Sequence, residues 1–268
     1  MDLHLQNKVA VIMGASKGIG FATAKAFLCE GCKVAITARH KAELLEAADG
    51  LSEYGEVYAA VVDATDDQGV YRFAEEVCKK WRYIDCWINN VGTTGSKAGA
   101  EYTVSEIRFI TDTCFTSAVI GCQAAFRCMK GRGGVIVNVS SLAARCPSAG
   151  RSTLYGPLKA AIVNLTTTMA GEYCADGIRV VCVMPGFTLT PLVKRNIPAD
   201  ELEYNSRGTL LRRLADPMEI ARPIVFLASD AASYMTATAV EVSGGRAVTL
   251  NPSFAYDRKE KQGYVDRL

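Results

Sequence analysis

Apolar runs alternate with helical patterns along the whole chain, and this alternation constrains the fold more than any other feature. The runs are rich in Val, Ile, Ala and Cys, as in strands buried on both faces, and cover residues 8–13, 32–37, 56–62, 84–89, 134–139, 178–183 and 239–242. Between them, apolar residues recur at helical spacing over residues 19–30, 41–52, 67–81, 104–129, 153–173 and 217–229. This order predicts an α/β fold with a Rossmann-like, doubly wound parallel sheet of about seven strands.

Size and charge favour one soluble domain. The 268 residues include 30 basic and 28 acidic side chains, for a net charge of +2, so we expect no nucleic-acid and no membrane partner. The chain begins without an apolar signal core, and no apolar run approaches the ~20 residues of a membrane span. We therefore expect a cytoplasmic protein with a single domain over residues 1–268.

Two segments interrupt the alternation. Residues 187–213 follow a strand, contain no compact helix of ordinary length, and carry several Leu, Val and Ile among charged residues. Their place after the carboxyl end of a strand predicts a substrate lid, and the alternative is a plain surface insertion. The polar tail, residues 251–268, covers a site, joins a subunit contact or is disordered.

Cysteines and histidines give little support for a metal site. The chain has 10 cysteines and 2 histidines, and without a secretion signal the cysteines are expected to be reduced thiols in the core. Cys29 and Cys32 form a CxxC motif. Neither a second CxxC nor a nearby histidine completes a zinc site, so we expect no metal and no redox role for this pair.

A glycine-rich turn joins the first strand to the first helix in the pattern GxxxGxG. Glycines permit a tight turn and close approach of the backbone to a pyrophosphate, which the helix N-terminus then binds. In this place the pattern indicates a dinucleotide site. The turn contributes Gly14, Ser16, Lys17, Gly18, Ile19 and Gly20 to the expected site.

The end of the second strand indicates which dinucleotide binds. An acidic residue there would bind the ribose 2′-hydroxyl of NAD, but this chain has Ala38 followed by Arg39. A guanidinium pairs with a 2′-phosphate, and Lys17 adds a second cation. We therefore expect NADP(H), with two solvated surface cations as the alternative interpretation.

Tyr155 and Lys159 lie four residues apart in a predicted helix, so they share one face. A nearby ammonium lowers the pKa of a phenol from its usual value of about 10, and the pair is therefore a candidate general acid/base. Pro157 disfavours a helical bond from its own position. We expect the helix to begin close to Thr153, with Tyr155 in its first turn.

Together these residues resemble the short-chain dehydrogenase/reductase family over nearly the whole chain. Its YxxxK pair matches Tyr155 and Lys159, and its catalytic serine lies where Ser140 and Ser141 end a strand. The resemblance implies a nucleotide-binding half over residues 1–92 and a catalytic half over residues 93–250. It implies further cofactor contacts, in addition to Tyr155 and Lys159, from Asp63, Ala64, Asn90, Gly92, Pro185, Gly186, Thr188 and Thr190.

The resemblance also implies a mechanism. Ser141 would hydrogen-bond the substrate carbonyl oxygen, Tyr155 would exchange a proton with that oxygen, and Lys159 would lower the tyrosine pKa and hold the nicotinamide ribose. The YxxxK spacing favours carbonyl reduction over enoyl reduction. Family members are generally homotetramers or homodimers that bind small ketone or alcohol substrates, and the same is expected here.

The chain departs from the family pattern at two places. Cys114 stands where the family has an asparagine that relays protons, and a thiol is a poor substitute for an amide. Either Cys114 acts in catalysis or it packs in the core. The spacing from Ser141 to Tyr155 is one residue longer than expected, so Ser140 remains an alternative to Ser141.

Substrate identity is the least constrained property. The apolar lid and a resemblance to bacterial 7α-hydroxysteroid dehydrogenases favour a hydroxysteroid or another bulky cyclic ketone. The alternatives are a 3-oxoacyl thioester, a small diketone or polyol, and a non-catalytic NADPH-binding regulator. The chain continues well beyond Gly245, where 3-oxoacyl reductases usually stop. Arg145 and Arg151 are candidates to bind a substrate carboxylate, and solvated arginines are the alternative.

Overall fold

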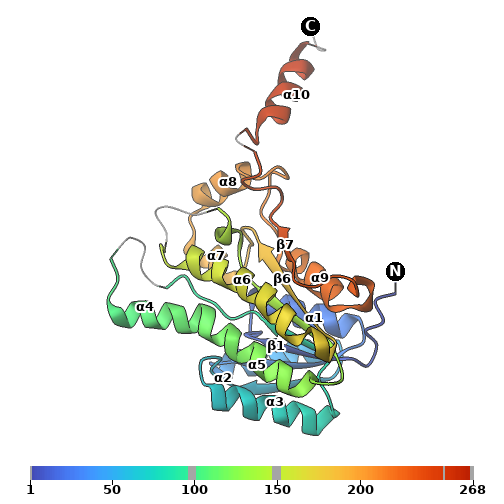
Figure 1. Cartoon of the computed structure of the whole chain (residues 1–268). Coiled ribbons are helices and arrows are strands. Elements are labelled where there is room, and N and C mark those ends of the chain that lie inside the picture. Colours follow the sequence, from blue (N-terminus) through green and yellow to red (C-terminus); the bar gives the residue numbers. More distant parts are fainter. Residues whose placement is uncertain (1, 96–100, 147–151, 250, 266–268) are drawn as a thin grey trace.

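The computed structural model describes residues 2–95, 101–146, 152–249 and 251–265, with side chains to residue 260. A 7-stranded sheet with the order β3-β2-β1-β4-β5-β6-β7 forms its centre (Figure 1). Every pair of neighbouring strands is parallel, which confirms the predicted fold. The strands are β1 Val9–Met13, β2 Lys33–Ala38, β3 Val57–Val61, β4 Cys86–Asn89, β5 Gly134–Val139, β6 Ile178–Pro185 and β7 Ala239–Val242.

Helices cover both faces of this sheet. One apolar cluster joins one face to α1, α2 and α9, and a second joins the other face to α3, α5 and α6. Sequence and structure agree to within two residues on the ends of these helices, except for the start of α5. Their bounds are α1 Gly18–Cys29, α2 Lys41–Ser52, α3 Asp67–Trp81, α5 Ser117–Met129, α6 Tyr155–Tyr173 and α9 Pro217–Ala228.

The predicted helix over residues 104–129 is not uniform. It consists of α4 (Val104–Thr111), a π-helical turn, η1 (Asp112–Thr116), and α5. By length and composition alone this stretch would be able to cross a membrane. More than half of its most apolar window is buried inside the fold, as expected for a core helix.

The expected lid contains more helix than the sequence indicated. Short helices α7 (Pro191–Asn196) and α8 (Ala199–Arg207) form within residues 187–213. Thr190 begins α7, because its side chain accepts a hydrogen bond from the Val193 backbone and Pro191 follows it. The tail forms α10 (Phe254–Val265), which extends away from the sheet (Figure 1).

A buried polar network joins the central strands to α6. Asn89 Nδ2 donates to Asn138 Oδ1 at 2.8 Å, and Asn138 Nδ2 donates to Thr166 Oγ1 at 3.0 Å. Trp87 Nε1 donates to Asn89 Oδ1 at 2.8 Å. Asn138 is fully buried, so its amide depends on these partners. The network fixes α6, which carries Tyr155 and Lys159, against β4 and β5.

Asn138→Ala is expected to lower the free energy of unfolding by about 1–3 kcal/mol, because it removes the buried hydrogen bonds of Asn138 with Asn89 and Thr166. Urea denaturation measures this change. The control is Asn164→Ala on the exposed face of α6, with an expected change below about 0.5 kcal/mol. Equal effects of the two substitutions would contradict a stabilising role for the network.

Candidate active site

The predicted site residues gather at the carboxyl ends of the strands. The glycine turn follows β1, Asn90 follows β4, Ser140 follows β5, and Gly186 follows β6. Strands β1 and β4 are neighbours, and the strand order reverses between them. In doubly wound sheets, ligands bind in the crevice at this switch point.

The glycine turn has the shape of a pyrophosphate cradle. Gly14 and Gly18 have φ angles of +76° and +62°, which favour glycine. A Cβ at Gly20 would collide with Gly14 O and Asn90 Nδ2, and Asn90 Nδ2 donates to Gly14 O at 2.8 Å. Among the described residues, no side chain caps the N-terminus of α1. Its free N–H groups therefore fit an anionic ligand.

The other end of the expected cofactor site contains an unanticipated ion pair. Lys17 Nζ lies 3.0 Å from Glu43 Oε2 and 3.1 Å from Glu43 Oε1, so Lys17 is not the free cation that the sequence indicated. Arg39 is exposed and makes no hydrogen bond or ion pair with the described residues. Glu43 was missed because acidic residues are common in the first turn of any helix.

Asp63 and Ala64 follow β3 as expected. Asp63 is exposed, and its Oδ1 accepts hydrogen bonds from Thr65 N at 2.9 Å and Thr65 Oγ1 at 2.8 Å. Ala64 is buried. The carboxylate is thus oriented by its own turn, and its contact with the cofactor stays a prediction.

Tyr155 and Lys159 lie together in the first turns of α6. Lys159 is 3% exposed, and its Nζ donates to Val139 O at 2.9 Å. The same Nζ lies 5.7 Å from the centre of the Tyr155 ring. The helix begins at Tyr155, and Leu158 N donates to Leu154 O, so Pro157 occupies its third position, where it disrupts no helical bond. This start confirms the expectation for Tyr155.

Ser140 and Ser141 have different partners. The buried Ser140 Oγ donates to Lys159 O at 2.6 Å, which links β5 to α6. Ser141 is half-buried, and its Oγ accepts from Ala143 N at 3.1 Å at the start of the short helix η2 (Leu142–Ala144). The Ser141 hydroxyl proton has no acceptor among the described residues. The geometry therefore favours Ser141 as the group available to a substrate.

Cys114 is packed in the core and also holds the loop after β4. It is fully buried within η1. Its Sγ accepts from Thr93 N at 3.3 Å and donates to Thr93 O at 3.0 Å. A Cβ at Gly92 would lie 3.0 Å from Lys159 Nζ and 3.9 Å from Cys114 Sγ. The thiol therefore holds this backbone beside Lys159, and a part in proton transfer stays a prediction.

The segment after β6 faces the glycine turn. Gly186 N donates to Val242 O at 2.8 Å, and Thr188 Oγ1 donates to Gly186 O at 3.1 Å. A Cβ at Gly18 would lie 3.2 Å from Thr190 Cγ2. These contacts bring Pro185, Gly186, Thr188 and Thr190 to the same crevice as the turn.

Arg145 is largely exposed and lies near an acidic side chain of the protein. Its Nη1 lies 3.8 Å from Glu241 Oε2 on β7. Arg151 lies outside the described residues. The candidate carboxylate-binding arginines thus gain no support from the structure.

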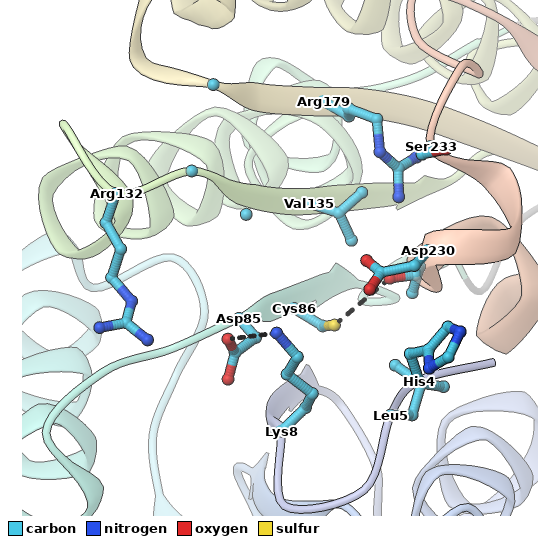
Figure 2. A pocket seen from close by; sticks show the side chains of 14 residues that line it. His4, Leu5, Lys8, Asp85, Cys86, Arg132, Val135, Arg179, Asp230 and Ser233 are labelled. Carbon is cyan, nitrogen blue, oxygen red and sulfur yellow. Dashed lines mark hydrogen bonds and ion pairs between the residues drawn. The ribbon is translucent and has the colours of Figure 1, made fainter.

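A hollow of about 430 Å³ lies at the opposite edge of the sheet, where strands begin (Figure 2). Two of its basic side chains, Lys8 and Arg179, have partners within the protein. Lys8 Nζ lies 3.5 Å from Asp85 Oδ1, and the Arg179 guanidinium donates to the carbonyl oxygens of Leu227, Ser229 and Met235. These side chains stabilise the fold around the hollow, and the hollow is separate from the expected cofactor site.

Cysteine and acidic side chains form no metal-binding group in the part of the chain that the structure describes. All 10 cysteines are free. Cys32 of the CxxC motif is buried and donates to Leu5 O, and burial raises its pKa to about 12. Such a thiol is a poor nucleophile at neutral pH.

Comparison with known proteins identifies the family. The model of a family described as enoyl-(acyl carrier protein) reductase matches residues 14–247. The 3-oxoacyl-(acyl-carrier-protein) reductase of Chlamydia pneumoniae is 34% identical over 252 residues, which cover 91% of this chain and 99% of that protein.

Two solved structures share the whole fold. L-Sorbose reductase from Gluconobacter frateurii, complexed with NADPH and L-sorbose, has a TM-score of 0.86 at 34% identity, over 93% of this chain and 100% of that chain. A 7α-hydroxysteroid dehydrogenase complexed with NADH and 7-oxo glycochenodeoxycholic acid has a TM-score of 0.87 at 30% identity, over 93% and 98%. Together with the site geometry, these matches show that the chain belongs to the short-chain dehydrogenase/reductase family of oxidoreductases, which act on ketone and alcohol groups.

Proposed function

We propose that this protein is an NADP(H)-dependent enzyme that interconverts a ketone and a secondary alcohol at the carboxyl ends of β1, β4, β5 and β6. The buried Lys159 ammonium carries this proposal, because Val139 O fixes it beside the Tyr155 ring. A buried ammonium next to a phenol stabilises the phenolate and prepares the phenol for proton transfer.

NADP(H) fits the residues at both ends of the crevice. The cradle at Gly14, Gly18 and Gly20 suits a pyrophosphate, and Ala38 leaves the end of β2 without a carboxylate. Arg39 is free to pair with a 2′-phosphate. The relative from Gluconobacter was solved with NADPH, which supports this choice, whereas the hydroxysteroid dehydrogenase was solved with NADH.

NADP(H), held at the glycine turn and by Arg39, would supply or accept the hydride at the carbonyl carbon, and the protein would supply orientation and a proton. In reduction, Tyr155 donates its proton to the carbonyl oxygen while the Ser141 hydroxyl donates a hydrogen bond to the same oxygen. Lys159 stabilises the phenolate that Tyr155 leaves, and solvent then returns the proton. Ser140 holds the Lys159 backbone and Cys114 holds the Thr93 backbone, and through these contacts they position the site.

A bulky cyclic ketone is the favoured substrate. Leu192, Leu210 and Leu211 expose apolar side chains in the lid region, and one structural relative binds an oxo-bile acid. A 3-oxoacyl thioester is the second candidate, supported by the reductase of Chlamydia pneumoniae. The extension beyond Gly245 does not separate the two, because each relative leaves a similar share of this chain unmatched.

The proposal includes assembly of the protein with copies of itself and a cytoplasmic location. Val104, Ile107 and Phe109 are exposed on α4, and burial of such apolar side chains favours a homotetramer or homodimer through α4, α5 and α6. The family's soluble fold supports a cytoplasmic location.

Tyr155→Phe is expected to lower kcat by at least about 100-fold, because the proton donor is lost, and to leave NADPH affinity within about twofold. Absorbance at 340 nm measures turnover, and fluorescence titration measures binding. A protein with unchanged turnover would exclude this role for Tyr155, and a wild-type protein that binds NADPH but reduces no ketone would support a non-catalytic regulator.

Arg39→Ala is expected to raise the Kd for NADPH about tenfold, because a charge-assisted bond to the 2′-phosphate is lost. The Kd for NADH is the internal control and should stay nearly constant. An unchanged ratio of the two constants would remove the main support for NADP(H).

A ketone panel distinguishes the substrate classes. We expect the highest kcat/KM with NADPH for an oxo-bile acid, lower values for an acetoacetyl thioester, and the lowest values for L-sorbose, because the lid exposes apolar side chains. NADPH oxidation at 340 nm measures all three. Fastest turnover of the thioester would replace the favoured substrate by the second candidate.

A further inference from the structure

The Lys17–Glu43 ion pair occupies the region where the 2′-phosphate of NADPH is expected. Lys17 belongs to the glycine turn, and Glu43 lies in the first turn of α2. Both carboxylate oxygens lie within 3.1 Å of the ammonium. The first turn of α2 begins just after Arg39 at the end of β2, so Lys17, Arg39 and Glu43 come from the elements that border one end of the crevice.

Glu43 is surrounded by positive groups. Hydrogen bonding from Lys17 lowers the pKa of Glu43, and the charges of Lys17, His40 and Arg195 lower it further. Arg195 lies in α7, so the lid contributes a cation within electrostatic range of the same carboxylate. Positive groups from the glycine turn, the start of α2 and the lid thus act on the Glu43 carboxylate. The same groups would act on a bound phosphate.

We propose that Glu43 reduces the preference for NADPH over NADH by holding Lys17 in the free protein, in the place that a 2′-phosphate takes when NADPH binds. This proposal rests on the NADP(H) assignment made above. A phosphate must displace the carboxylate from Lys17 and is repelled by it. The neutral 2′-hydroxyl of NADH meets no such penalty. Glu43 therefore lowers the preference for NADPH that Arg39 and Lys17 provide.

The expected effect is small, because the pair is solvated. The side chains of Lys17 and Glu43 are 49% and 44% exposed, and exposed ion pairs are weak and screened by salt. Glu43→Gln should lower the Kd for NADPH about two- to fivefold and leave the Kd for NADH nearly unchanged. Added salt should reduce the difference.

The control is Glu46→Gln, which removes the same charge from the exposed face of α2. No hydrogen bond or ion pair of Glu46 occurs among the described residues. Both variants and the wild type are titrated with NADPH and NADH by fluorescence, with no substrate present. The same titrations on Lys17→Gln and Lys17→Gln/Glu43→Gln test the mechanism, because Glu43 should lose most of its effect on NADPH once Lys17 is gone.

Several results would overturn the proposal. Weaker NADPH binding in Glu43→Gln would mean that Glu43 orients Lys17 toward the phosphate. Equal effects of Glu43→Gln and Glu46→Gln, or equal changes for NADPH and NADH, would mean that Glu43 has no specific role. If the wild type binds neither dinucleotide, the NADP(H) assignment fails as well, whereas tight wild-type binding of NADPH with an inert Glu43 removes this inference alone.

Discussion

The arrangement of the catalytic half depends on one buried ammonium. A buried charge is costly unless hydrogen bonds satisfy it, and Lys159 meets this requirement through the carbonyl of Val139. Ser140 fastens the backbone of Lys159 to the same strand end, and Gly92 gives the ammonium room that a side chain would remove. Lys159 Nζ therefore lies where strand β5, the loop after β4 and helix α6 meet. Tyr155 lies beside this atom.

The nucleotide half follows the opposite principle, because the described residues provide no side-chain partner for the backbone N–H groups at the start of α1. Lys17 provides no side-chain cap for α1, and Gly20 brings the helix against the Gly14 carbonyl. Asn90 satisfies that carbonyl and so connects β4 to the turn after β1. One half thus holds a cation inside the protein, while the other presents N–H groups for an anion from outside.

Features that depend on local pattern could be predicted from the sequence. Strand and helix positions follow from hydrophobic periodicity. The position of Pro157 predicted the start of α6 to within two residues of the observed start at Tyr155. Features that depend on contacts between distant residues could not. The π-helical turn accompanies the contact of Cys114 with Thr93, and the partner of Lys17 is on another helix. The roles of the site residues follow from family resemblance and geometry together.

The π-helical turn also has a consequence for chain length. An α-helix turns by about 100° per residue, whereas a π turn closes its hydrogen bonds five residues apart and is wider. The turn from Asp112 to Thr116 therefore accommodates an extra residue while α4 and α5 keep nearly the same relative orientation. The residue that a deletion there would remove thus matters for the local position of the Cys114 thiol against Thr93 rather than for the packing of α5 on the sheet.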